Sequence, residues 1–355
     1  MNAPVTEHGH PLGTHRVLEP PGAMPQDAWR IDNTPVAADN ELLCEVEVLN
    51  IDSASFRQIA EACEFDAQRI GEHIVKTVGE RGKQHNPVTG SGGMFVGRVL
   101  EIGNALQEKI ELHVGDRIAS LVSLSLTPLH LEAIEAVDVA TGRVWVRGKA
   151  ILFESGIWTR LPADIDENVA LAVLDVAGAP AQVPHLCSQG QTVVVIGAAG
   201  KSGLFSCAQA KACVGPQGRV IGLVHDASAE PAQLLVRAGL VDDLIAVDAR
   251  RALETSSRLE AVAPQLADLV INCVNVPGTE LSSILCARDG GSVYFFSMST
   301  SFTAAALGAE GVGRDVTMII GNGYTKGHAE TALQTLRDHP ELHAYFNATY
   351  ARKQP

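Results

Sequence analysis

The spacing of apolar residues divides this chain into two parts near residue 165. Before that point, short apolar runs close to glycines are typical of strands, and they cover 41–52, 93–103 and 116–122. Between Phe56 and Gly82, apolar residues recur at helical spacing instead, which predicts one or two helices inserted between strands. These helices either cap the β structure or form a lid. The first half is therefore predicted to be a small, strongly bent β domain.

After residue 167, helical stretches alternate with buried strands. The predicted strands lie within 191–197, 218–226, 242–247, 268–274, 290–298 and 317–323. Such alternation predicts a parallel, doubly wound sheet with right-handed crossovers. An amphipathic helix at 330–346 closes the chain. We therefore expect an α/β chain in three parts: a bent β domain at 1–167 with its helical insertion near 56–82, a doubly wound domain at 168–322, and a C-terminal segment at 323–355 that returns to the first domain.

A glycine-rich turn follows the first strand of the doubly wound part. Gly197, Gly200 and Gly203 form a GxxGxxG pattern between the apolar strand VVVI and a helix. These glycines permit a tight turn, close approach of a pyrophosphate and close helix packing, and the helix N-terminus attracts phosphate. The pattern predicts a Rossmann dinucleotide-binding domain; the alternative is a turn that only packs a helix. Lys201 and Ser202 lie in the same turn, and Lys201 is expected to meet phosphate unless the backbone does so alone.

The next strands predict how the dinucleotide is held. Asp226 follows the second strand, where an acidic residue binds the adenine ribose and favours NAD. No Arg lies in the next few residues, which weakens the case for NADP without excluding it. Asn272 and Asn275 end a central strand where the nicotinamide end would lie, and their amides either bind it or form an ordinary turn.

Composition excludes several classes of protein. The 355 residues contain 41 acidic and 27 basic side chains, so a net charge of −14 argues against nucleic-acid binding. No apolar run approaches a membrane span, and the polar N-terminus does not read as a signal peptide. The seven cysteines are irregularly spaced and include no CxxC pair, so we expect neither a disulfide framework nor a zinc knuckle, but a reducing cytoplasm.

A bent β domain followed by a Rossmann domain resembles the medium-chain dehydrogenase/reductase superfamily, whose first domain is GroES-like. The matching strings are VEVLNIDSASF, GSGGMFVGRVLEIG, VGDRI, VLDVAGAPA and VVVIGAAGKSG. Many members hold zinc through Cys and His in these segments, but here the segments contain neither. We therefore expect no bound metal. The resemblance also implies a homodimer or homotetramer paired through the edges of the Rossmann sheet.

Longer strings resemble one family in particular, L-erythro-3,5-diaminohexanoate dehydrogenase. They include HPLGTHRVLEPPGAMPQDAWRIDN, NPVTGSGGM, KAILFESGIW, INCVNVP and GNGYTKGHAE, and they span nearly the whole chain. This resemblance implies NAD-dependent oxidative deamination of a small diamino acid to 5-amino-3-oxohexanoate and ammonia in lysine fermentation. The alternatives are a zinc-free quinone or enoyl reductase that uses NADPH, or a cofactor-binding protein without turnover.

The implied reaction needs a general base and groups that hold a zwitterionic substrate. Four residues are candidates for these catalytic roles: Asp52, Glu154, Lys326 and His328. Asp52 lies where relatives carry their first zinc ligand, although it also suits a turn cap. Glu154 either faces the cleft or pairs with a surface Arg. His328 suits proton transfer and Lys326 suits a carboxylate, while the alternatives are a helix cap and a solvated loop charge. Asp175 lies near the third zinc-ligand position, which makes it a further candidate. The alternative for Asp175 is a structural role as a cap or at a hinge.

Overall fold

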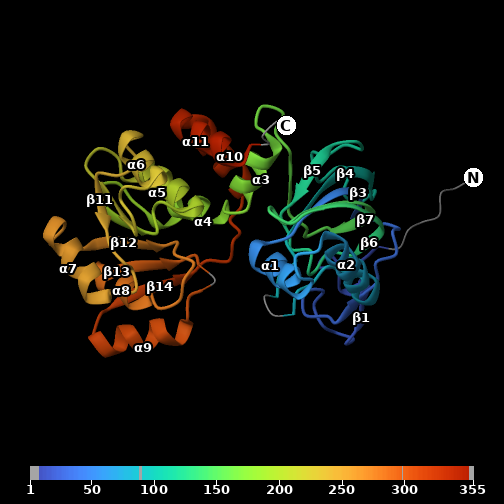
Figure 1. Ribbon diagram of the computed structural model, residues 1–355, viewed down its shortest axis with the longest axis horizontal. Coiled ribbons are helices and arrows are strands. Elements are labelled where there is room, and N and C mark those ends of the chain that lie inside the picture. The colour runs from blue at the N-terminus through green and yellow to red at the C-terminus, as the bar shows by residue number, and fades with distance from the viewer. Residues whose placement is uncertain (1–7, 88–89, 298, 352–355) are drawn as a thin grey trace, which may run out of the picture. The chain divides into compact units, whose positions relative to one another are not determined.

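The computed structural model describes residues 8–87, 90–297 and 299–351, and the chain divides into two compact units, 1–161 and 162–355 (Figure 1). Met298, which ends one predicted strand, lies outside the described residues. The units contain different kinds of sheet, antiparallel in the first and parallel in the second. This pair of sheets confirms the predicted fold class.

The first unit is built on a six-stranded sheet with the order β6-β7-β3-β4-β5-β8. Its strands are β3 (Glu41–Asn50), β4 (Met94–Ile102), β5 (Arg117–Ser120), β6 (Leu129–Asp138), β7 (Arg143–Phe153) and β8 (Trp158–Arg160). All the pairs are antiparallel, and the register shifts where β3 meets β4 and β7 and where β6 meets β7. Such irregularities bend a strand, so they account for the bent sheet that the sequence predicted.

Two helices, α1 (Ser53–Ala62) and α2 (Ala67–Arg81), occupy the predicted insertion. Carboxylates start both helices, because Asp52 accepts a hydrogen bond from the backbone of Ser55 and Asp66 accepts one from that of Arg69. The apolar faces of both helices join the core formed by the sheet. These helices therefore contribute to the hydrophobic core of the first unit.

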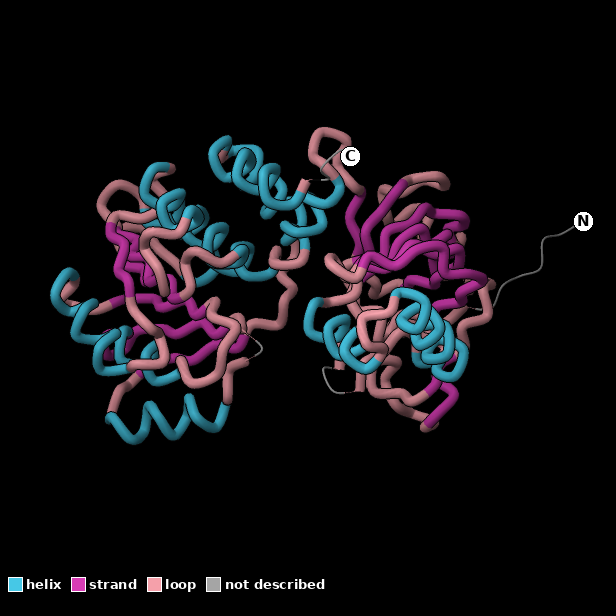
Figure 2. The backbone as a smooth tube through the Cα atoms, viewed as in Figure 1, coloured by secondary structure: helices cyan, strands magenta, loops and turns pink. Residues whose placement is uncertain are grey.

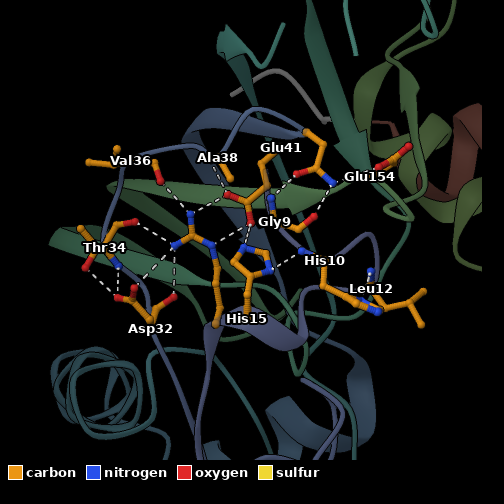
Figure 3. A network of polar contacts seen from close by, with 12 residues as sticks. Gly9, His10, Leu12, His15, Asp32, Thr34, Val36, Ala38, Glu41 and Glu154 are labelled. Carbon is orange, nitrogen blue, oxygen red and sulfur yellow. Dashed lines mark hydrogen bonds and ion pairs between the residues drawn. The ribbon is translucent and has the colours of Figure 1, made fainter. Parts of the chain in front are cut away.

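A buried ion pair fastens the N-terminal segment to this sheet (Figure 3). The segment contains the 3-10 turn η1 (Thr14–Arg16) and a small hairpin of β1 (Val17–Glu19) and β2 (Arg30–Ile31). Arg16 donates to both carboxylate oxygens of Glu41, at 2.8 and 2.6 Å, and also to three backbone carbonyls. Glu41 in turn accepts from the backbone of Ala38 and lies 3.0 Å from His15. The first unit is thus anchored by charge as well as by apolar packing.

The second unit contains a parallel sheet with the order β11-β10-β9-β12-β13-β14. Its strands are β9 (Thr192–Ile196), β10 (Arg219–Val224), β11 (Asp243–Ala246), β12 (Ala267–Asn272), β13 (Ala287–Phe295) and β14 (Val316–Ile320). In chain order this is 3-2-1-4-5-6, which is the arrangement of a dinucleotide-binding sheet. The covering helices are α5 (Lys201–Val214), α6 (Glu230–Arg237), α7 (Ala252–Val262), α8 (Glu280–Cys286) and α9 (Phe302–Val312). Figure 2 shows helices on both faces of this sheet, which explains the continuous apolar runs of its central strands.

Four further helices pack together in the second unit: α3 (Glu167–Leu174), α4 (Gly178–Leu186), α10 (His328–Asp338) and α11 (Pro340–Tyr350). Helix α10 packs on α3, α4 and α5, while α11 packs on α3 and α6. The C-terminal segment 323–355 therefore belongs to the second unit, whereas we expected its return to the first, and the boundary lies at 161/162 rather than 167/168. The physical reason is that buried residues of α10 and α11, including Leu336 and Phe346, pack within this helical layer.

No helix in the described chain is by itself long and apolar enough to cross a membrane, and the bent pair α3 and α4 meets that criterion only when both are counted together.

Candidate functional site

The glycine turn between β9 and α5 forms a cradle that side chains would fill. Gly197 has a φ of 80°, and a Cβ at this position would lie 2.8 Å from a methyl group of Val274. A Cβ on Gly203 would lie 2.2 Å from the carbonyl oxygen of Gly197. Gly200 precedes α5, and no side chain caps that helix, so its first turn offers backbone N–H groups to an anion. The turn therefore fits the pyrophosphate of a dinucleotide.

Two carboxylates stand at the carboxyl ends of β10 and β11. Asp226 accepts hydrogen bonds from the backbone and hydroxyl of Ser228 at 2.8 and 2.6 Å, and these bonds hold its pKa below the ordinary value. Asp248 binds Arg250 through both oxygens, and this contact likewise lowers the pKa of Asp248. His225 attracts both carboxylates, which places all these groups in one cluster.

The two asparagines at the end of β12 differ in what they can bind. Asn272 is fully buried, and its amide donates to the hydroxyls of Thr279 and Ser283 at 2.9 Å and accepts from the backbone of Val274. The fold already engages both N–H donors and the oxygen of this amide, which matches the alternative of an ordinary turn and gives no support to Asn272 as a cofactor ligand. Asn275 is exposed and accepts a hydrogen bond from Ser299, so its amide nitrogen can still reach a ligand.

Lys201 meets a carboxylate of its own chain. Its Nζ lies 2.7 Å from Oδ2 of Asp175, the residue that ends α3, and 6.0 Å from the ring centroid of Tyr350. Burial raises the pKa of the Tyr350 hydroxyl, and Asp175 adds to that shift. The neighbouring Ser202 is buried and hydrogen-bonds Cys273, so its side chain points into the fold. Asp175 thus has a partner that the sequence did not predict.

The segment after β14 carries the other candidates of the second unit. It packs tightly against the start of α4, because a Cβ on Gly178 would lie 2.3 Å from the carbonyl oxygen of Gly323. His328 begins α10, is buried, and meets the ring of Tyr324 edge-on at 5.2 Å, and burial lowers its pKa. Lys326 is exposed. A buried, neutral His328 supports the position of Tyr324, while Lys326 is accessible to a ligand.

The first unit contains Asp52 and Glu154, and the structure treats them differently. One oxygen of Asp52 caps α1 at 2.9 Å from the nitrogen of Ser55, while its Oδ2 is buried without a hydrogen-bond partner. The expected turn cap is present, and the second oxygen remains for a ligand. Glu154 accepts hydrogen bonds from Asn40 at 2.9 Å and from Lys109 at 2.8 Å, and these two bonds lower its pKa. Figure 3 shows Glu154 beside the N-terminal segment. The expected surface pair is present, with Lys rather than Arg as the partner, and these contacts give no support to the prediction of Glu154 as a catalytic residue.

Arg81, the last residue of α2, and two residues that follow this helix were not predicted from the sequence. Nε of Arg81, Oε1 of Gln84 and Nδ1 of His85 are buried without hydrogen-bond partners. Burial, together with Lys83 and Arg81, lowers the pKa of His85 to about 4, so its imidazole is neutral. Buried polar atoms without partners are uncommon and call for a ligand or water. The polar run GKQHN, directly after a predicted helix, could have indicated Gln84 and His85 as candidates from the sequence.

Within the described ranges, no group of three or more His, Cys, Asp or Glu side chains could hold a metal ion. Asp52 and Asp175, the two carboxylates that the sequence analysis predicted near zinc-ligand positions, lie in different units.

Comparison with known proteins gives consistent matches. A family model described as the N-terminal domain of L-erythro-3,5-diaminohexanoate dehydrogenase matches residues 15–162. Two curated relatives bear that enzyme name. The one from Acetoanaerobium sticklandii is 54% identical over 345 residues, covering 96% of this chain and 99% of the relative. The one from Fusobacterium nucleatum is 50% identical over 343 residues, with 96% and 99% covered.

A mycobacterial protein solved in complex with NADPH has a TM-score of 0.53 at 16% identity, covering 90% of this chain and 84% of the other. At that identity the likeness shows the fold alone.

Proposed function

This chain belongs to the L-erythro-3,5-diaminohexanoate dehydrogenase family, and we propose that it deaminates L-erythro-3,5-diaminohexanoate oxidatively with NAD, giving 5-amino-3-oxohexanoate and ammonia. The observation that carries the proposal is the identity of 54% and 50% to relatives of that name over nearly their whole length. The glycine cradle supports it independently, since it fits a dinucleotide. A role in lysine fermentation belongs to the same proposal.

The reaction assigns tasks to side chains. Bound NAD supplies the acceptor for the hydrogen that leaves C3 of the substrate. The amine at C3 must lose its extra proton before the hydrogen leaves C3. We assign Asp52 as the general base that takes this proton, because Oδ2 of its carboxylate is buried without a hydrogen-bond partner. Lys326 is assigned to the substrate carboxylate because it is exposed at the carboxyl end of β14. The proposed chemistry uses these groups in place of a zinc ion.

The preference for NAD over NADP is part of the proposal. Asp226 follows β10, where a carboxylate binds the ribose 2′-hydroxyl and repels a 2′-phosphate. Arg250, which follows β11, is held by Asp248 through three contacts of 2.7 to 3.2 Å. An arginine occupied in this way is less available to a 2′-phosphate.

Location and assembly are proposed on separate observations. All seven cysteines are free thiols, which supports a reducing compartment such as the cytoplasm. Strand β14 is an edge of the parallel sheet, and Ile320 on it is 65% exposed; Phe302 and Leu307 on α9 are also exposed. An exposed apolar sheet edge supports pairing of two copies as a homodimer, or as a homotetramer of such pairs.

The test mixes purified protein with the diamino acid and either NAD or NADP. We expect the absorbance of reduced nicotinamide to rise, with one ammonia released per nicotinamide reduced. No reduction with either dinucleotide would overturn the proposal. Quinone and enoyl substrates with NADPH are tested for comparison, and faster turnover of these substrates would favour the alternative function.

A further inference from the structure

The Lys201–Asp175 pair has features that neither stability nor phosphate binding explains. The side chains are 33% and 44% exposed, and exposed ion pairs contribute little to stability. A lysine in a glycine turn ordinarily serves phosphate, but this charge is already matched by a carboxylate at 2.7 Å. The backbone of the turn supplies anion contacts without it.

The pair stands on the nicotinamide side of the sheet. In a doubly wound sheet the ligand crosses the carboxyl ends at the middle of the strand order, and its adenosine lies over β10 and β11. Lys201 is the first residue of α5, directly after the turn that follows the central strand β9. Asp175 is three residues before Gly178, which packs on Gly323 in the segment after β14, at the opposite end of the sheet from β11. The pair therefore lies between the glycine turn and the β14 loop.

A deamination needs a group in this place, because losing the C3 hydrogen leaves an iminium ion that water must attack. Attack forms a bond from the water oxygen to C3 and releases a proton, and loss of ammonia breaks the C3–N bond after that nitrogen gains a proton. A carboxylate can accept and return the proton, while an ammonium group orients the water by hydrogen bonding without changing its own charge. Lys201 and Asp175 supply these two groups, and both are accessible to solvent.

We propose that Lys201 and Asp175 are catalytic residues for the hydrolysis of the iminium intermediate. Lys201 holds the attacking water. Asp175 takes the proton that this water loses, gives it to the nitrogen of the carbinolamine, and then takes the hydroxyl proton as ammonia leaves and the ketone forms. Asp175 finally gives this hydroxyl proton to the departing ammonia, which leaves as ammonium, and the carboxylate of Asp175 is restored. The proposal rests on the proposed function, since it requires an amine substrate and a nicotinamide dinucleotide as oxidant.

The experiment compares Lys201→Met and Asp175→Asn with a matched control, Lys211→Met. Lys211 lies on the same helix and forms a similar half-exposed pair, 2.6 Å from Asp242, near the other end of α5. Calorimetric titration with NAD measures cofactor binding, and rapid mixing with the diamino acid measures nicotinamide reduction and ammonia release separately. We expect both site variants to bind NAD within threefold of the unchanged protein and to retain the first burst of reduction, while ammonia release slows about 100-fold. The control should match the unchanged protein in every measurement.

A tenfold weaker affinity for NAD with normal ammonia release in Lys201→Met would instead assign Lys201 to phosphate and overturn the proposal. Ammonia release within threefold of normal in Asp175→Asn would also overturn it, and this variant serves if Lys201→Met fails to fold. If the unchanged protein reduces no nicotinamide with the diamino acid, the proposed function itself fails and this proposal falls with it. The two failures are therefore distinguishable.

Discussion

The buried pair of Arg16 and Glu41 offers a measurement of how the N-terminal segment stabilises the first unit. Arg16 is 5% exposed and Glu41 is 1% exposed, so removing either residue leaves the other one charged and buried without its ion-pair partner. Loss of one partner from such a pair costs about 3–5 kcal/mol of unfolding free energy. We therefore expect Arg16→Met and Glu41→Leu each to cost about that much.

The double variant separates the charge interaction from the other bonds. It removes both charges of the pair, but it still loses the contacts of Arg16 to three carbonyls and of Glu41 to Ala38 and His15. We expect its cost to resemble that of one single variant, so that the coupling between the two changes is about 3–5 kcal/mol.

The assay is urea unfolding followed by tryptophan fluorescence. The three tryptophans, Trp29, Trp145 and Trp158, all lie in the first unit, so their signal reports the unfolding of that unit. Arg57→Met is the control, because Arg57 forms an exposed pair with Glu61 and its loss should leave the free energy of unfolding unchanged. A cost below about 1 kcal/mol for Arg16→Met, or a double variant equal to the sum of the singles, would refute the reasoning.

Three further predictions concern the site. Gly203→Ala should weaken NAD binding at least about tenfold, because its Cβ would lie 2.2 Å from a backbone oxygen; Gly79→Ala, where nothing lies within 4 Å, should leave calorimetric binding unchanged, and equal affinities would contradict the cradle. Asp52→Asn should lower kcat/KM about 100-fold at constant NAD affinity, and full activity in steady-state assays would remove Asp52 from the chemistry. His85 has a pKa of about 4 in the fold against 6.5 as its ordinary value, so the unfolded chain takes up the proton first as pH falls. Stability from this residue is complete above pH 6.5 and is lost between 6.5 and 4; after allowance for solvent screening it amounts to about 1–2 kcal/mol. Urea unfolding across that range should show a smaller loss in His85→Gln, and parallel pH curves would contradict this.

The sheet of the second unit was predictable because its central strands are short and buried on both faces. Continuous apolar runs such as β9 and β12 are read directly from the sequence. Strand β6 was missed, because it is an edge strand with mostly half-exposed or exposed residues and shows little alternation. The final helices were predicted as helical but were assigned to the wrong unit, since helical spacing shows which face is apolar and not which surface it meets.

The sequence alone determined the features that depend on local geometry. Gly197 and Gly203 form a recognisable turn because a positive φ and a close backbone approach admit no side chain there. Only the tertiary structure decided which polar groups are already paired, because such partners come from distant parts of the chain. Glu154 meets Asn40 across 114 positions and Lys201 meets Asp175 across 26. A hydrogen-bonding group shows its chemistry in the sequence, but its availability depends on neighbours that only folding brings within bonding distance.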